Sequence, residues 1–190
     1  GRKFLGGKSY ETNVYVDGST MFGGDKSGKD RYNEGVKYAE ENYESLTKDL
    51  KDGETFKVVS HSEGSAYGAG IAAYLIEKGH KVESIANFSA DEADEFSNPI
   101  EPTVFQLHSD EDPVSPSYRA GNTDYSISLP ATNLLENHGK TITKSSVEIM
   151  TELYDMAKSK EANDKKSGQK EKSFKITDTK GKIFKDAKAH

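Results

Sequence analysis

Apolar and polar residues alternate along the chain in two ways, one typical of β-strands and the other of amphipathic α-helices. Short apolar runs predict strands at residues 12–17, 56–60, 81–88, 103–108 and 125–129. Elsewhere the apolar side chains recur at steps of three and four residues, so they line one face of a helix. These helices are expected at residues 30–50, at residues 65–78, and around a stripe formed by Val147, Met150, Tyr154 and Ala157.

The order of these elements predicts the class of fold. Because strands and helices alternate along the chain, we expect an α/β fold whose mainly parallel central sheet carries helices on both faces. The helix at residues 65–78 is rich in glycine and alanine. Glycine is a poor helix former, so we expect the backbone of this helix to pack closely on the sheet.

The charge distribution divides the chain near residue 158. The whole chain of 190 residues has a net charge of −6, but residues 160–190 contain ten lysines and five acidic residues. These residues therefore carry +5 and the preceding chain −11. An acidic body lacks the positive face that binds nucleic acid. We predict one folded domain at residues 1–158, followed at residues 159–190 by a lysine-rich linker and a small β-hairpin tail.

Several kinds of site and segment are not expected from the residue types. The chain contains no cysteine, which excludes disulfides, cysteine nucleophiles and thiolate zinc sites. It has no run of 18 apolar residues, so we expect no transmembrane helix, and its first residues do not resemble a signal peptide. The first residue is not methionine, which suggests a part of a longer protein.

We also expect no metal ion and no cofactor. Acidic residues cluster at 91–95 and 110–112, but their spacing matches no known cation-binding loop. The glycine pairs at residues 6–7 and 23–24 lack the spacing of a phosphate-binding loop.

The strongest chemical signal is the pentapeptide Ser-His-Ser-Glu-Gly at residues 60–64, between a predicted strand and the glycine-rich helix. A nucleophile elbow has this layout, because it holds a serine on a sharp, strained turn above the strand ends. Gly64 supplies the small residue expected after the serine, whereas Ser60 replaces the glycine usual before it. Ser62 is the candidate nucleophile, and the backbone N–H of Glu63 would face a developing oxyanion. The alternative is an ordinary turn in which Ser62 caps the helix.

A serine nucleophile needs a histidine base, and the base needs a carboxylate that orients it. Asp112 is the best candidate for the acid, because it opens the Asp-Pro-Val-Ser-Pro segment that follows the strand at residues 103–108. Asp110 is the second candidate and Asp91 the third, and the alternative is ordinary turn chemistry.

The base is expected after the acid in the chain order serine, aspartate, histidine. Only His138 and His190 lie there, and His190 is the last residue, so His138 is the candidate base. The alternative for His138 is a surface residue at the end of a helical turn.

Taken together, these motifs resemble small lipase- or esterase-like members of the α/β-hydrolase superfamily over about residues 12–158. The resemblance implies a serine hydrolase that needs no cofactor and acts on a small-molecule or lipid ester. It also implies a second oxyanion-hole donor from the loop at residues 18–24, where Ser19 and Thr20 are the nearest matches. An inactive hydrolase-fold binding module and an amide or thioester hydrolase are the alternatives, and no oligomeric state is predicted.

The first three residues, Gly-Arg-Lys, carry a second resemblance. They are similar to the start of the variable C-terminal domains of bacterial YD-repeat (rearrangement-hotspot) proteins. Those domains are often toxins or effectors released at the cell surface, so the resemblance implies a secreted or cell-surface location as part of a larger protein.

Overall fold

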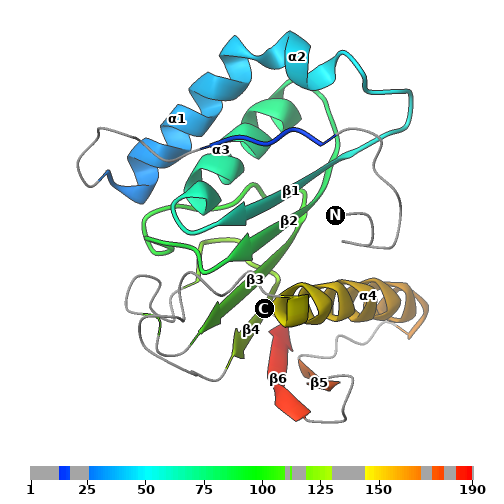
Figure 1. Cartoon of the computed structure of the whole chain (residues 1–190). Helices are drawn as coiled ribbons and strands as arrows, with labels where there is room; N and C mark the ends of the chain where they lie inside the picture. Colours follow the sequence, from blue (N-terminus) through cyan, green and yellow to red (C-terminus); the bar gives the residue numbers. More distant parts are fainter. Residues whose placement is uncertain are drawn as a thin grey trace.

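The computed structural model describes residues 13–17, 26–109, 112, 119–129, 144–167, 173–177 and 183–189 (Figure 1). Its helices and strands follow one another in the order α1 (Gly28–Glu41), α2 (Tyr43–Thr47), β1 (Phe56–His61), α3 (Gly64–Glu77), β2 (Val82–Phe88), β3 (Thr103–Ser109), β4 (Tyr125–Leu129), α4 (Lys144–Ser167), β5 (Ser173–Thr177) and β6 (Ile183–Ala189).

The strands form one sheet in the order β1-β2-β3-β4-β6-β5. The pairs β1–β2, β2–β3 and β3–β4 are parallel. Strand β6 is antiparallel to β4, with Tyr125 opposite Ala189, and β5 pairs antiparallel with β6 at the outer edge. Strands β1 to β4 run in one direction. The segments that follow them therefore begin along the same edge of the sheet, the one formed by the carboxyl ends of these strands.

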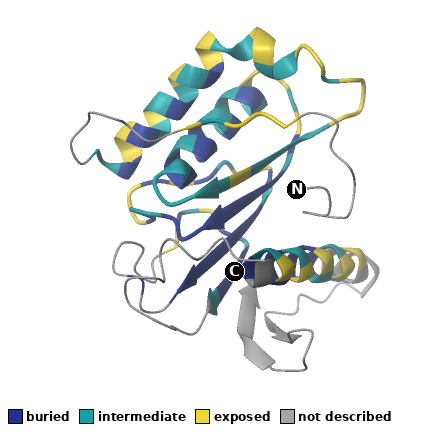
Figure 2. Ribbon diagram, in the orientation of Figure 1, coloured by how far each residue is buried: buried dark blue, intermediate teal, exposed yellow. Residues whose placement is uncertain are grey.

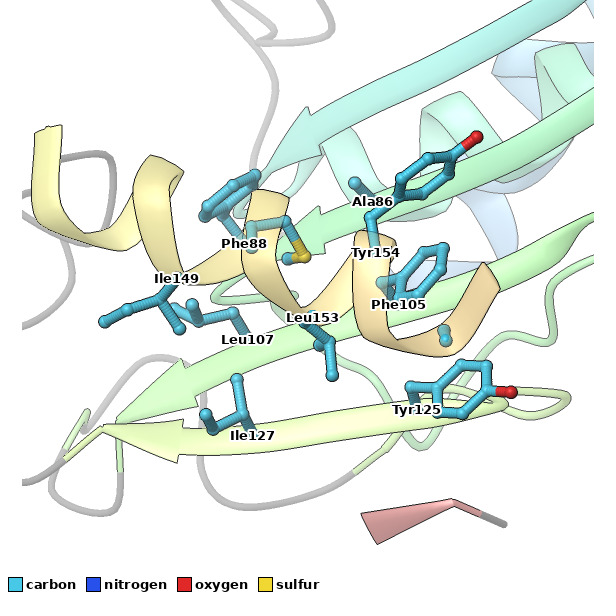
Figure 3. Close-up of a cluster of buried hydrophobic side chains, with 11 residues drawn as sticks. Ala86, Phe88, Phe105, Leu107, Tyr125, Ile127, Ile149, Leu153 and Tyr154 are labelled. Atoms are coloured by element: carbon cyan, nitrogen blue, oxygen red, sulfur yellow. The ribbon is translucent and has the colours of Figure 1, made fainter. Parts of the chain in front are cut away.

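Helices cover both faces of this sheet (Figure 1). On one face, α4 packs Ile149, Leu153 and Tyr154 onto apolar side chains of β2, β3 and β4 (Figure 3). On the other face, α3 packs Ala72 and Leu75 against the opposite side of β2 and β3. The inner strands are the most deeply buried part of the molecule (Figure 2). The predicted α/β fold with a mainly parallel sheet and helices on both faces is confirmed.

A cluster of polar side chains connects α4 with β1 and β2. The hydroxyl of Tyr154 donates a hydrogen bond to Glu83 Oε1 over 2.6 Å. The ammonium group of Lys57 lies 3.6 Å from the Glu83 carboxylate and 4.9 Å from the centre of the Tyr154 ring. Burial raises the pKa of Glu83, but the Tyr154 hydrogen bond and the charge of Lys57 outweigh it, so the pKa lies below its usual value.

Helices α1 and α3 contact each other through reciprocal glycines. A Cβ atom added at Gly35 would lie 2.0 Å from the carbonyl oxygen of Tyr67, and one at Gly70 would lie 2.0 Å from that of Tyr32. The glycine content of α3 predicted a close approach of its backbone to the sheet. A close approach exists, but the tightest contact of α3 is with α1. Against the sheet the contact is looser, since a Cβ atom at Gly68 would lie 3.0 Å from Val58 Cγ1.

Two predicted elements near the start of the chain differ from the structure. Residues 13–17 form no strand, because Val14 and Tyr15 are 53% and 91% exposed and have no sheet face to cover. The helix predicted at residues 30–50 begins at Gly28, where Ser27 caps it, and is interrupted at Asn42. Asn42 has a φ of −112° and a ψ of 15°, outside the helical region, and its side-chain amide donates to the carbonyl of Tyr38.

The last helix also differs from the prediction. A linker was expected from residue 159, but α4 continues to Ser167. The reason is that residues 144–167 contain no glycine or proline, and lysine, glutamate and alanine are good helix formers. The division at residue 158 stays a prediction, although β6 lies in the same sheet as β4. None of the described helices is long and apolar enough to cross a membrane.

Candidate active site

Ser62 lies on the turn that joins β1 to α3. Its φ is +55°, in the left-handed region that a side chain with a Cβ atom adopts only at a cost. Two backbone hydrogen bonds hold this turn. The N–H of Ser62 donates to the carbonyl of Phe88 over 3.0 Å, and the carbonyl of Ser62 accepts from the N–H of Ser65 over 2.9 Å. A strained serine between a strand and a helix is the geometry that a nucleophile elbow requires.

The residue after Ser62 offers a hydrogen-bond donor. Glu63 is the N-cap of α3, with helical dihedral angles of −51° and −32°. Among the described residues, no acceptor pairs with its backbone N–H. The N-terminus of a helix also carries a partial positive charge, which favours a developing anion. Ser19 and Thr20, the candidates for a second donor, lie outside the described residues.

The serine that replaces the usual glycine of the elbow is held by polar contacts. Ser60 Oγ donates to Asn87 Oδ1 over 2.7 Å and lies 3.4 Å from Ser65 Oγ. Asn87 is fully buried and donates in turn to Asn98 Oδ1 over 3.3 Å. The elbow therefore rests on a buried polar chain that runs from β1 through β2 to the loop after it.

A small residue is expected at position 64 of an elbow. Among the described residues, a Cβ atom added at Gly64 would meet nothing within 4 Å. The tighter contact of α3 with β1 is at Gly68, one turn further along α3. A Cβ atom there would lie 3.0 Å from Val58 Cγ1 and 3.5 Å from Ser60 Cβ.

Asp112 follows the carboxyl end of β3 and is only 3% exposed. Its N–H donates to the carbonyl of Ser109 over 3.2 Å, which folds the chain back at the strand end. A buried carboxylate is costly unless it is paired, so this position suits a functional acid. Asp91 follows β2, and its Oδ1 accepts from the N–H of Glu92 over 3.0 Å, as in a local turn. Asp110 lies outside the described residues.

His138 lies outside the described residues, in the segment that follows β4. Of the other histidines, His80 precedes β2 and is therefore at the opposite edge of the sheet. Its Nε2 lies 2.7 Å from the hydroxyl of Tyr43. His61 is the last residue of β1, and His108 is buried within β3. Ser62 and Asp112 thus follow strands at the same edge of the sheet, and the structure does not describe His138.

Arg31, in α1, was not singled out from the sequence. Its side chain is 4% exposed, and its Nη1 lies 2.6 Å from Glu63 Oε2. Within α1 it shares the buried face with Gly28, Gly35 and Ala39. This spacing could have predicted the burial of Arg31 from the sequence, because residues three or four positions apart lie on the same face of a helix. Among the described residues, no group of three or more histidine or acidic side chains is placed to hold a metal ion.

No protein-family model and no curated protein matches the chain. A similar solved structure is described as "Pyrobaculum calidifontis esterase monoclinic form", with 14% sequence identity and a TM-score of 0.37. The match covers 70% of this chain and 60% of the esterase chain, so this chain spans less than two thirds of that protein's length. Similarity at this level assigns no family. None of these comparisons supports the resemblance to YD-repeat proteins, which stays a prediction.

Proposed function

We propose that the chain is a serine hydrolase that cleaves an ester by acyl transfer to water, with Ser62 as the nucleophile. The observation that carries the proposal is the conformation of Ser62. A φ of +55° in a serine between a parallel strand and a helix is backbone strain of the kind that clusters at active sites. It lies next to an amide N–H, that of Glu63, for which the described residues provide no acceptor.

The order of the strands supports the rest of the triad. The nucleophile follows β1, the proposed acid Asp112 follows β3, and the proposed base His138 follows β4, which pairs with β3. All three strands are parallel, so the three segments begin at one edge of the sheet. The chain order is that of the α/β-hydrolases.

In the proposed reaction, His138 takes the proton of Ser62 Oγ, which attacks the ester carbonyl and forms a C–O bond. The N–H of Glu63 and a second donor at Ser19 or Thr20 stabilise the oxyanion. The C–O bond to the alcohol then breaks, and the alcohol leaves with the proton from His138. A water molecule, deprotonated by His138, releases the acid and restores Ser62. Asp112 orients the imidazole and stabilises its charged form.

The test is turnover of a short-chain nitrophenyl ester by the full chain and by two serine variants. Ser62→Ala is expected to lower kcat by several orders of magnitude. Ser84→Ala changes a buried serine within β2, away from the turn, and is expected to stay within about threefold of the unmodified chain.

Equal turnover by the Ser62→Ala variant would refute the assignment of the nucleophile. A chain that hydrolyses nitrophenyl amides or thioesters through Ser62, but not esters, would keep the mechanism and change the substrate class. A chain that turns over none of them would favour a binding module.

A further inference from the structure

Arg31 connects α1 to the residue that follows the nucleophile. Its Nη1 donates a hydrogen bond to Glu63 Oε2 over 2.6 Å. Its Nε donates to the carbonyl of Lys26 over 3.1 Å and lies 3.7 Å from Glu92 Oε2. The Arg31 side chain is only 4% exposed, and its guanidinium contacts the carboxylates of Glu63 and Glu92 and a backbone carbonyl.

The N-terminal end of α1 is fixed beside the elbow. The N–H of Gly28 donates to Glu95 Oε2 over 2.9 Å, and a Cβ atom at Gly28 would lie 3.0 Å from the carbonyl oxygen of Glu92. Further along, the glycine contacts hold α1 against the backbone of α3. Arg31 is therefore presented to Glu63 from a packed helix and not from a flexible loop.

The position of Glu63 makes this ion pair relevant to the reaction. Its backbone N–H is the proposed oxyanion donor, while its carboxylate belongs to the same residue and is negatively charged. An uncompensated carboxylate beside a developing oxyanion opposes the charge that the N–H is to stabilise. Arg31 places a positive charge beside that carboxylate, whose side chain is 38% exposed.

We infer that Arg31 is a positioning residue of the oxyanion hole: by pairing with Glu63 it fixes the Glu63 amide and removes the opposing charge. This inference rests on the proposed function. It differs from a purely structural role, in which Arg31 would only tie α1 to α3. The structural role predicts a loss of stability alone, whereas the positioning role predicts a fall in kcat that depends on the charge of Glu63.

The experiment measures kcat, KM and Tm for a double-mutant cycle of the full chain on a nitrophenyl ester. Arg31→Met is expected to lower kcat by about 10- to 100-fold, as a displaced catalytic group does, with KM changed less than about threefold. Glu63→Gln removes the opposing charge together with the ion pair, so its kcat is expected to fall less than that of Arg31→Met. In the Arg31→Met background, Glu63→Gln is expected to restore part of the lost kcat.

The matched control is Lys37→Met, which removes a cation from the exposed face of the same helix, where Lys37 pairs with Glu41. It is expected to leave kcat and Tm unchanged. If Arg31→Met does not fold, Arg31→Gln replaces it in the cycle. Glutamine removes the charge but keeps a polar side chain, so a similar fall in kcat is expected, again partly reversed by Glu63→Gln.

A folded Arg31→Met or Arg31→Gln variant with unchanged kcat would overturn the inference. So would a double variant no faster than the single arginine variant, because the loss would then be structural. Ser62→Ala separates these outcomes from failure of the proposed function. If Ser62→Ala is inactive and the arginine variant is not impaired, only the role of Arg31 is wrong. If Ser62→Ala is fully active, the proposed function and the role of Arg31 fail together.

Discussion

Replacing Gly70 by alanine is expected to force α1 away from α3. The added Cβ atom would lie 2.0 Å from the carbonyl oxygen of Tyr32 and 3.0 Å from the backbone nitrogen of Val36. Ordinary contacts of a Cβ atom begin near 3.4 Å, so the helices must separate by about 1.4 Å in a close-packed interface. The obstacle is backbone, which cannot rotate aside as a side chain can.

Two opposing effects set the size of the change. Overpacking typically lowers the free energy of unfolding by about 1–3 kcal/mol, and by more where the neighbouring atoms cannot move away. Glycine to alanine inside a helix stabilises it by about 1 kcal/mol. Because the neighbour at Gly70 is backbone, we expect a net loss of about 2 kcal/mol in the free energy of unfolding. For a chain of this size that loss corresponds to a fall in Tm of about 4–8 °C.

Two other glycines of α3 provide matched controls for the same chemical change. At Gly64 the new Cβ atom meets no atom of the described residues within 4 Å, so alanine is expected to stabilise the chain by up to about 1 kcal/mol. At Gly68 it meets Val58 Cγ1 at 3.0 Å, a side-chain atom that can shift, so the net change is expected near zero. Thermal unfolding followed by circular dichroism ranks the variants. A Tm for Gly70→Ala at or above that of Gly64→Ala would refute the packing argument.

Three further predictions concern acid stability, the catalytic acid and the C-terminal hairpin. The pKa of Glu83 is lowered from 4.5, because the hydrogen bond from Tyr154 and a lysine charge outweigh the effect of burial. Its contribution to stability is present above the unfolded pKa and lost as the pH falls through the lower folded pKa. The urea midpoint should therefore fall less between about pH 6 and pH 3 for Glu83→Gln than for the unmodified chain, and equal falls would contradict this. Asp112→Asn is expected to lower the acylation rate, measured by stopped flow, by about 10⁴-fold, whereas Asp91→Asn should cost less than about tenfold; the reverse order would move the acid to Asp91. Deleting residues 173–190 exposes the edge of β4, so a lower Tm and self-association in sedimentation are expected, with esterase activity retained. Unchanged stability would show that the hairpin adds nothing to the sheet.

The central part of the fold could be predicted because its apolar pattern and its packing agree. The predicted strands at residues 56–60, 103–108 and 125–129 match β1, β3 and β4 to within one residue at each end. Residues 13–17 have the same kind of apolar pattern but form no strand, since a pattern does not supply a surface to pack on. At the other end, the density of lysines suggested a solvated linker, while the same residues favour a helix that has no breaker before Gly168.

The candidate site was predictable only where the backbone carries the signal. The elbow at Ser62 was expected from its position between a strand and a glycine-rich helix, and the positive φ agrees with it. Arg31 was missed because a charged residue in a helix normally faces solvent, and its acidic partner at Glu63 is distant in the sequence. His138, Ser19 and Thr20 stay predictions, because they lie outside the described residues.

The most direct test of the central claim is covalent labelling of the full chain by a fluorophosphonate, followed by peptide mapping in a mass spectrometer. Such a probe reacts with a serine that is activated by a base and that lies beside an oxyanion hole, which stabilises the negative charge formed during the attack. The peptide that contains Ser60, Ser62 and Ser65 is expected to carry one adduct, located on Ser62 by fragmentation. The adduct should be absent from Ser62→Ala. No adduct on the native chain, or an adduct that persists elsewhere in Ser62→Ala, would contradict Ser62 as an activated nucleophile.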